Sequence, residues 1–470
     1  MRAASSTSSV VDSSDITGAP LPSLRQCAAY VASLAKPDVC EVLDLCRARQ
    51  RVALQPRCGV GDHDMMIELL AALEEKAEPD LLTVTIDSHT RLKRFREAMR
   101  VMNAHPEDLN GYPLVAHGWW RGRQLNESVE APLQIRHGSP DPRVLFNVSI
   151  ASGITSFEGG GISYNLPYSK DVPLAESLSA WREVDQRCGD LAELGVLVDR
   201  EMFGTLTAVL MPPSISLAIS VIEAALAARE GVRCCTIAYP QGGHLIQDAA
   251  ALRCIPELAE RYLPSDTQVH PALHGFMGVF PQQRDHAEDL IFSASLTARI
   301  GSASKVVTKT YQEAYGIPDT EANVAGLRLS DRANSPLWNL ISLDTERVDE
   351  EMRWILAEVS DLVDPVLGQR DPLAAVVDSF ERGTLDVPFS ASRHARSEVI
   401  PARDAEGAIR YLSTGSLPFS QEALLRHREL LKGRQVGKGR PGQLLNTLSD
   451  DINYFRYVLG EVPEHTMREG

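Results

Sequence analysis

Residues 51–87 read RVALQPRCGVGDHDMMIELLAALEEKAEPDLLTVTID, and this stretch contains the repeat that decides the fold. Two short apolar runs, RVALQPR (51–57) and LLTVTID (81–87), flank the amphipathic segment MMIELLAALEEKA. Short apolar strands that alternate with helices are typical of parallel strand–helix–strand units. The stretch therefore predicts two parallel strands joined by a crossover helix.

The same alternation continues along the chain, with amphipathic stretches such as SISLAISVIEAALAARE between several of the runs. Eight or nine runs across residues 51–310 predict an α/β fold, a (β/α)₈ barrel of the TIM type. A doubly wound open sheet is the alternative. No GxGxxG or GxxxxGK[ST] motif follows a strand, which weakens the nucleotide-binding form of that alternative. The further runs are PLVAHG (113–118), LQIRHG (133–138), GITSFEGG (153–160), VLVDREMFG (196–204), CCTIAYP (234–240), QVHPALHG (268–275) and KVVTKT (305–310).

The two ends of the chain differ from this central region. The Ser-rich residues 1–20 predict a disordered tail, and residues 21–50 predict an N-terminal helical extension. We expect the barrel to span residues 51–345. Residues 346–470 begin with helical patterns such as ERVDEEMRWILAEVSDLVD and continue into a loop-rich segment. They predict a C-terminal α+β extension that packs on the barrel.

The composition is that of a soluble globular protein. The chain has 470 residues, of which 44% are hydrophobic and 23% charged, and its formal net charge is −16. This charge argues against a nucleic-acid partner, and no stretch has the apolar length needed to cross a bilayer. The eight cysteines form no CxxC motif, and a chain of this size needs no disulfides. We therefore expect free thiols in a reducing cytoplasm and no metal site.

Nearly every apolar run ends in polar residues. In a barrel the carboxyl ends of the strands meet at one mouth, where the active site forms. Polar side chains at these ends are therefore predicted to face a common site. They are Arg57, Asp87 to Arg91, His117, Arg136, His137, Glu158, Glu201, His274 and Lys309.

Three of these strand ends carry an arginine, namely Arg57, Arg91 and Arg136. A planar guanidinium binds a carboxylate through two parallel hydrogen bonds, a geometry that lysine cannot copy. Each arginine alone is more simply explained as the partner of a structural acid at the barrel rim. The three together predict a site for a small dicarboxylate.

The run FEGGGISYNLPYSK (157–170) combines a carboxylate, three glycines and two tyrosines. Glycines without side chains let a ligand approach the backbone, although a glycine triplet is more often only a turn. A buried carboxylate such as Glu158 needs a partner or a task. A substrate ammonium, a transferred proton and a salt bridge to one of the arginines remain the three explanations.

Two other short patterns bear on the site. Lys309 and Glu313 have the i, i+4 spacing of an ordinary helical ion pair, but Lys309 ends a predicted strand and fits a rim position as well. The stretch DSHTR (87–91) begins like the DxHxxG signature in which a histidine takes the lower axial position of cobalamin. Leu92 replaces the glycine, so we assign no metal to His89.

These motifs resemble the family of glutamate mutase epsilon subunits, which are adenosylcobalamin-dependent mutases. The similarity runs in register from about residue 50 to 330 and resumes at DVPFSAS and IPARDAEGAIRYL. The motifs that carry it are LQPRCGVG (54–61), TIDSHTR (85–91), NGYPLVAHG (110–118), LQIRHGSPD (133–141), EGGGISYNLPYSK (158–170), REMFGTLT (200–207), IQDAAALRC (246–254), HGFMGVFPQ (274–282) and KTYQEAYGIPDTEAN (309–323).

The resemblance implies a (β/α)₈ barrel that interconverts L-glutamate and (2S,3S)-3-methylaspartate by a radical rearrangement. It implies a small cobalamin-binding sigma subunit as partner, which carries the axial histidine, and a heterotetramer that contains a homodimer of this chain. It also implies that Glu158 is catalytic and faces the substrate ammonium. The other implied substrate residues are Arg57, Arg91, Arg136, His137, Tyr164 and Tyr168. The implied adenosylcobalamin contacts are Gly59, Asn110, Pro167, Phe280, Lys309, Glu313 and Ile317.

Several positions depart from the family pattern. The family has Tyr where His89 stands and Trp where Phe276 stands, and AYPQGGH (238–244) replaces a GYGECGN-like segment. A related mutase subunit for another glutamate-like dicarboxylate is therefore one alternative. A non-catalytic barrel subunit is a second. An unrelated barrel lyase or aldolase, in which Lys309 forms a Schiff base, is a third.

Overall fold

The structure is a computed structural model that describes residues 20–432, 434 and 441–462. The disordered tail expected for residues 1–20 lies outside this described part, except for its last residue. No helix in the described ranges is long and apolar enough to cross a membrane.

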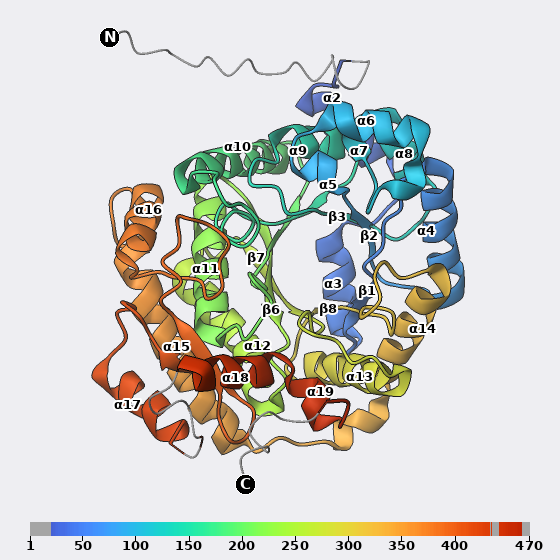
Figure 1. Cartoon of the computed structure of the whole chain (residues 1–470). Coiled ribbons are helices and arrows are strands. Elements are labelled where there is room, and N and C mark those ends of the chain that lie inside the picture. Colours follow the sequence, from blue (N-terminus) through green and yellow to red (C-terminus); the bar gives the residue numbers. More distant parts are fainter. Residues whose placement is uncertain (1–19, 433, 435–440, 463–470) are drawn as a thin grey trace.

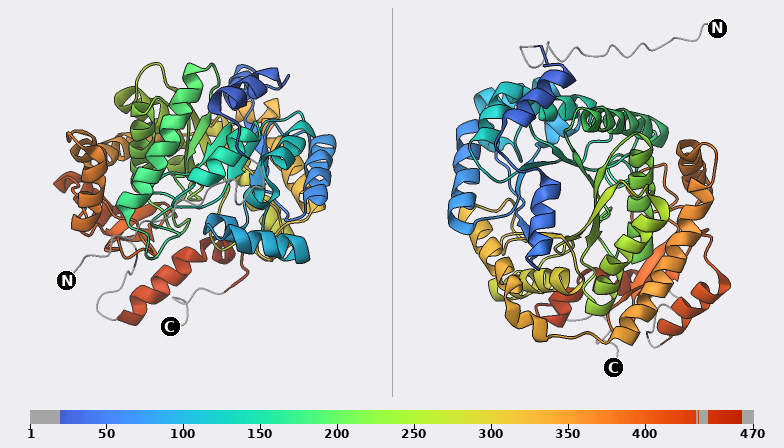
Figure 2. Two further views of the ribbon diagram at one scale, coloured as in Figure 1. Left: turned by 90° about the horizontal axis from the view of Figure 1, so that it is seen from above. Right: turned by 180° about the vertical axis from the view of Figure 1, so that it is seen from behind.

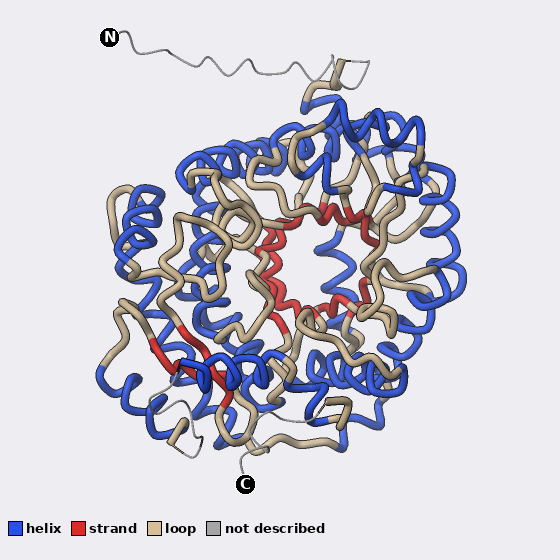
Figure 3. Tube along the Cα trace, in the orientation of Figure 1, coloured by secondary structure: helices blue, strands red, loops and turns tan. Residues whose placement is uncertain are grey.

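Eight parallel strands form a ring at the centre of the molecule (Figures 1 and 3). From β2 to β8 each strand pairs with the next along the chain, and β8 pairs with β1. Backbone hydrogen bonds from Leu81 and Thr85 to Leu54 and Cys58 join the segments of β1 and β2. The predicted (β/α)₈ barrel is confirmed, and the open-sheet alternative is wrong. The strands are β1 (Ala53–Gln55), β2 (Leu82–Thr85), β3 (Leu133–Arg136), β4 (Ser156–Glu158), β5 (Asp199–Met202), β6 (Cys234–Pro240), β7 (Gln268–His274) and β8 (Lys305–Val307).

One of the predicted strands is a helix. The run PLVAHG (113–118) forms α7 (Leu114–His117), a single turn between β2 and β3. Leu114 and Val115 are fully buried in the main core, which explains the apolar character of the run. A short buried run has no periodicity that separates a strand from a helical turn.

Helices cover the outside of the barrel (Figure 1). Helix α4 shows why such segments are helical. It begins after Asp62, whose side chain caps the first turn, and its buried residues Met66, Leu70 and Leu73 recur every three or four positions. The outer helices are α4 (His63–Ala77), α5 (Ser88–Arg91), α6 (Phe95–Ala104), α8 (Trp119–Glu127), α9 (Arg143–Ala151), α10 (Leu174–Glu193), α11 (Pro213–Arg229), α12 (Leu245–Tyr262), α13 (Arg284–Ile300) and α14 (Thr320–Asp331), with the 3₁₀ turn η1 (Pro106–Asp108).

Two helices precede the barrel. Helix α2 (Leu24–Ser33) packs against α9 and α10, and α3 (Val39–Ala48) packs against β1 and β7. Seen from behind, α3 lies across the opening of the strand ring (Figure 2, right). It therefore covers the amino ends of the strands, opposite the mouth predicted to hold the site.

The C-terminal region packs along one side of the barrel. Helix α15 lies against α11 and α12, and a buried ion-pair group of Glu351, Arg410 and Arg426 ties it to the β9–β10 hairpin and α17. The elements are η2 (Arg332–Asn334), η3 (Pro336–Leu340), α15 (Thr345–Leu367), α16 (Pro372–Arg382), β9 (Ile400–Arg403), β10 (Ile409–Ser413), α17 (Gln421–Leu430), α18 (Pro441–Ile452) and α19 (Tyr454–Val458).

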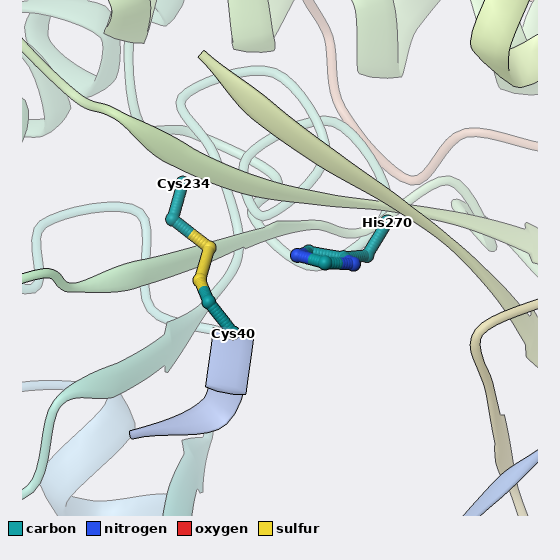
Figure 4. Close-up of side chains that lie close together, drawn as sticks. All are labelled: Cys40, Cys234 and His270. Atoms are coloured by element: carbon teal, nitrogen blue, oxygen red, sulfur yellow. A yellow bond between two sulfur atoms is a disulfide. The ribbon is translucent and has the colours of Figure 1, made fainter. Parts of the chain in front are cut away.

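A disulfide joins Cys40 of α3 to Cys234 of β6 (Figure 4). The expectation of free thiols is therefore wrong for this pair. The two cysteines are 194 residues apart, and only the folding of α3 onto the barrel brings them together. The other six cysteines are free and buried.

The barrel interior is polar, and Lys305 provides a test of its importance. The fully buried Lys305 ammonium lies 2.6 Å from Glu201 in an ion pair. Replacing Lys305 by Met should lower the free energy of unfolding by about 3–5 kcal/mol, because it leaves a buried acid without its cation. Urea denaturation measures the change. The exposed Lys76→Met variant is the control, and a loss for Lys305→Met no larger than for this control would contradict the expectation.

Candidate active site

Two buried acids stand side by side at the centre of the site. Glu158 ends β4, and Glu201 lies opposite it on β5 in register. Their exposed fractions are 1% and 0%. Because an unpaired buried carboxylate is costly, the surrounding residues have to supply cations or hydrogen-bond donors to both.

Arg136 and Tyr164 hold Glu158. The Nη2 atom of Arg136 forms an ion pair with Oε1 of Glu158 at 2.8 Å, and the Tyr164 hydroxyl donates a hydrogen bond to Oε2. Arg136 also lies 4.0 Å from Glu201. Of the three explanations that the sequence left open for Glu158, a salt bridge to an arginine is thus present in the structure.

Three side chains form hydrogen bonds with Glu201. Its Oε1 lies 2.6 Å from Nε2 of His274, and its Oε2 accepts hydrogen bonds from Lys305 (2.6 Å) and Gln134 (2.7 Å). Thr205 in turn lies 2.8 Å from Nδ1 of His274. Lys305 and Gln134 were missed by the sequence analysis because they stand at or near the start of their apolar runs, before the strand ends. Two polar residues within otherwise apolar strands were the available signal.

The pKa values of the two acids are displaced in opposite directions. Burial raises the pKa of Glu158, and the charge of Glu201 adds to this rise. Although burial opposes it, the charge of Lys305 and the hydrogen bond with His274 hold the pKa of Glu201 well below its usual range. Burial also lowers the pKa of His274 to about 4. Glu201 is therefore a fixed anion, whereas Glu158 can change its protonation closer to neutral pH.

Glu158, Glu201 and His274 offer possible metal-ligand atoms within 4.8 Å of one another. Arg136 and Lys305 already neutralise the two carboxylates. The cluster is therefore explained as an ion-pair network, and we assign no metal ion to it.

Arg57 and Arg91 surround Tyr168 together with Arg136. Burial and the charge of Glu158 raise the pKa of Tyr168, while all three guanidiniums act to lower it. A side chain at Gly138 would lie 3.7 Å from the Arg91 side chain and 4.0 Å from the Tyr168 ring. Within the described ranges Arg57 and Arg91 have no ion-pair partner. Arg57 and Arg91, without an ion-pair partner among the described residues, thus lie near Arg136, which pairs with Glu158.

The three glycines of the 157–170 loop have a packing role. Gly159 has a φ of +110°, and a Cβ there would lie 2.2 Å from the Tyr164 ring. A Cβ on Gly160 would meet the carboxyl group of Glu223, also at 2.2 Å, and one on Gly161 would meet the backbone of α10. The loop therefore needs glycines to pack against the chain behind it.

Glu223 of α11 holds the same loop from behind. Its Oε1 accepts hydrogen bonds from the backbone N–H groups of Ile162 (2.7 Å) and Ser163 (2.8 Å), and its Oε2 from the Ser163 hydroxyl (2.9 Å). Burial raises the pKa of Glu223 to about 7. This acid was missed by the sequence analysis. The signal was a lone acid in the apolar helix SISLAISVIEAALAARE.

We expect the Gly159→Ala variant to lose about 100-fold in turnover. The new methyl group would push the Tyr164 ring away from Glu158, and a displacement of about 1 Å in a catalytic site can cost this much. Steady-state kinetics measures the loss. Gly195→Ala is a matched control, since Gly195 also has a positive φ (+82°) but no atom within 4 Å of the added Cβ. Equal activities of the two variants would contradict the packing role.

His137 is buried beneath the arginines. Its ring stacks on Trp181 at 5.7 Å and lies edge-on to Tyr164 at 4.8 Å. Its Nδ1 accepts a hydrogen bond from the Ser139 backbone, and Nε2 has no hydrogen-bond partner in the described part of the chain. Burial, with the charge of Arg200, holds the pKa of His137 well below its usual range. The ring is therefore a neutral wall of the site.

The predicted cofactor residues lie in loops that follow β1, β2, β4, β7 and β8, at the same end of the barrel. Lys309 is buried and pairs with Glu313 at 2.9 Å, in a turn and not on a helix. Burial lowers the pKa of Lys309 to about 8. Of the remaining predicted residues, Gly59 packs on Thr85, and the Asn110 side chain accepts a hydrogen bond from the backbone N–H of Ser88. Pro167 lies in the 157–170 loop. Phe280 is buried, whereas Ile317 is 61% exposed.

The C-terminal region supports the loops of the site. The Ser390 hydroxyl donates to the Leu166 carbonyl (2.7 Å), and the Thr207 hydroxyl donates to the Pro388 carbonyl (3.0 Å). These contacts explain why DVPFSAS, far from the barrel in sequence, belongs to the motifs that surround the site.

Comparison with known proteins agrees with these features. The family model described as methylaspartate mutase E chain matches residues 36–456. The glutamate mutase epsilon subunit of Desulfitobacterium hafniense (strain Y51) is 40% identical over 430 residues, which cover 88% of this chain and 87% of that protein. The glutamate mutase epsilon subunit of Halobacterium salinarum is 42% identical over 410 residues, with 86% of each chain covered. With its barrel, its buried acid pair and this similarity along most of its length, the chain belongs to the methylaspartate mutase E chain family and is an enzyme of this mutase class.

Proposed function

We propose that this chain is the large catalytic subunit of a glutamate mutase, which interconverts L-glutamate and (2S,3S)-3-methylaspartate with adenosylcobalamin. The observation that carries the proposal is that Arg57 and Arg91, which have no ion-pair partner among the described residues, lie beside Arg136 and Glu158. Glutamate and methylaspartate each have two carboxylates and one ammonium. Three guanidiniums and one adaptable carboxylate match this set of charges.

Glu158 has a positioning role in this proposal. Its carboxylate accepts a hydrogen bond from the substrate ammonium, while Arg136 and Tyr164 fix its orientation. The positive charge of the ammonium favours the ionised acid and offsets the effect of burial on the pKa of Glu158. Arg57 and Arg91 bind the carboxylates through bidentate hydrogen bonds. These contacts fix the substrate carbon chain relative to the barrel mouth.

The residues proposed for adenosylcobalamin fit such a group. They belong to loops on one rim, and Tyr315 and Ile317 on that rim are 70% and 61% exposed. Exposed apolar side chains of this kind suit the broad face of a large macrocycle. Lys309 and Glu313 neutralise each other beneath the rim. When bound, the cofactor supplies the radical chemistry of the rearrangement, and the chain's own residues orient the substrate and exclude water.

A small cobalamin-binding sigma subunit is the proposed partner, in a heterotetramer that contains two copies of this chain. The relatives are named epsilon subunits, which supports a multi-subunit enzyme. Several large apolar side chains are exposed on the mouth loops and offer a surface for a capping protein. They are Leu92, Tyr315, Ile317 and Phe389.

An anaerobic assay tests the proposal. The full chain is combined with a small cobalamin-binding subunit encoded near it, adenosylcobalamin and L-glutamate, and 3-methylaspartate is measured. We expect product only when all components are present. A cob(II)alamin signal that arises with another dicarboxylate and not with glutamate would identify that dicarboxylate as the substrate. Absence of product and of this signal with every dicarboxylate would overturn the proposal in favour of a non-catalytic subunit. Trapping of a carbonyl substrate on Lys309 by borohydride would instead identify a Schiff-base enzyme.

A further inference from the structure

A second group of reactive side chains lies at the end of the barrel away from the mouth, and Figure 4 shows how its three members lie together. Cys40 is in the first turn of α3, Cys234 is the first residue of β6, and His270 is on β7. On its strand Cys234 shares a face with Thr236, which bonds Asp199 inside the barrel. By the same alternation His270 shares a face with His274. All three side chains thus meet where α3 covers the barrel interior.

These side chains offer a set of donors suited to a metal ion. Their ligand atoms lie within 4.8 Å of one another, and all three residues are buried. Neither ring nitrogen of His270 has a hydrogen-bond partner among the described residues, although the residue is only 1% exposed. Buried polar groups are nearly always partnered, so an imidazole with two free nitrogens beside two sulfurs needs an explanation.

We propose that Cys40, Cys234 and His270 hold a zinc ion when the two cysteines are reduced. Two thiolates and one neutral imidazole are a ligand set that zinc prefers. With Zn–S bonds of about 2.3 Å in a tetrahedral site, the two sulfurs stand about 3.7 Å apart. The Cα atoms of the two cysteines are 7.0 Å apart, just beyond the range that a disulfide usually spans. Little backbone movement is therefore needed for the sulfurs to separate around an ion.

The electrostatics of this position favour a cation held by thiolates. Cys40 lies in the first turn of α3, where the helix dipole stabilises a negative charge. The charges of Asp199 and Asp44 favour a cation beside His270, whereas those of Arg47 and Lys305 oppose it. Asp199 itself is occupied by the Ser156 and Thr236 hydroxyls, both at 2.7 Å. The fourth position on the ion is therefore left to water.

The disulfide and the zinc site are two states of one cysteine pair. A small dithiol reductant transfers two electrons and two protons to the Cys40–Cys234 bond and becomes a disulfide itself. The S–S bond breaks and two thiols form. Zinc binding then displaces the two thiol protons to solvent. In both states α3 stays fastened to β6, and in the zinc state it is also fastened to β7 through His270.

Cobalt(II) titration of the full chain tests the proposal. The protein is reduced with a dithiol, freed of reductant and metal without oxygen, and titrated with Co²⁺, which takes zinc positions and reports thiolate ligands by charge-transfer absorption. We expect about one Co²⁺ per chain with this absorption, and its loss when Zn²⁺ is added. The oxidised protein should bind none. Reduced protein that shows no thiolate absorption would overturn the proposal.

Three variants assign the ligands. Cys234→Ser should remove the charge-transfer absorption of the two thiolates or weaken Co²⁺ binding at least tenfold. His270→Ala should weaken Co²⁺ binding to a similar extent. Cys235→Ser is the matched control, because Cys235 is the next residue on β6, equally buried and free, with its side chain on the other face. Equal Co²⁺ binding by Cys234→Ser and Cys235→Ser would overturn the site.

Mass spectrometry of the alkylated wild-type protein gives a check that needs no variant. Zinc should protect Cys40 and Cys234 from alkylation, and alkylation of these two cysteines in the presence of zinc would contradict the proposal.

Discussion

Replacing Glu158 by Gln should lower the turnover number of the assembled enzyme by about 100-fold or more. The amide keeps the shape of the carboxylate and can still accept the hydrogen bond from Tyr164. It has no negative charge, however, with which to hold the substrate ammonium and to balance Arg136. The substrate would therefore bind with its ammonium unpaired and its carbon chain displaced. Steady-state kinetics with L-glutamate measures the effect.

The same variant changes the pH dependence. Burial raises the pKa of Glu158 above that of an ordinary carboxyl group. As the pH drops, kcat/KM of the wild-type enzyme should therefore begin to fall at a pH closer to neutrality than the pKa of an ordinary carboxyl group. In Glu158→Gln this acid limb should disappear. Glu358→Gln is the control, since Glu358 is an equally buried acid, paired with His427 in the C-terminal region. A variant with wild-type turnover and an unchanged acid limb would rule out the role of Glu158.

Replacing Arg91 by Lys should raise KM for glutamate by about 10-fold to 100-fold. Lysine keeps the positive charge but loses the planar fork, and a hydrogen bond to a charged group contributes about 1.5–3 kcal/mol. Arg91 has no ion-pair partner in the described ranges, so its loss leaves no protein acid uncompensated. The effect should therefore appear in substrate binding and leave the free energy of unfolding nearly unchanged.

Arg96→Lys is the control for this prediction, because Arg96 lies on the exposed side of α6, one turn further along the chain. Kinetics and urea denaturation of both variants separate binding from stability. A KM for Arg91→Lys equal to that of Arg96→Lys would remove Arg91 from the carboxylate clamp. A large loss of stability in Arg91→Lys would instead assign it a structural role.

The sequence is informative where a feature depends on neighbours along the chain. The alternation of strands and helices is visible in residues 51–87 and predicts the barrel. The barrel rule then places polar strand ends at one mouth, and Arg136 and Glu158 do lie in contact there. PLVAHG was assigned wrongly because a short buried run looks the same in a strand and in a helical turn.

The partners of the central acids could not be predicted in this way. Lys305 reaches Glu201 across 104 residues, and Gln134 reaches it across 67. Lys305 is the first residue of its apolar run and Gln134 the second residue of another, and neither stands at a strand end that marks the mouth. Only the closure of the ring places them on one interior face, where burial makes their pairing with Glu201 necessary.

The sequence by itself determined the barrel, and it predicted the mouth at which the candidate site lies and the arginines and the acid of that site. Tertiary structure alone decided which acid each cation neutralises, which side chains require the glycines of the 157–170 loop, and that Cys40 meets Cys234 and His270 beneath α3. The physical reason is that periodicity and strand ends are local properties of the chain. Pairing and close packing depend on atoms that are distant in sequence, and these leave no pattern until the chain has folded.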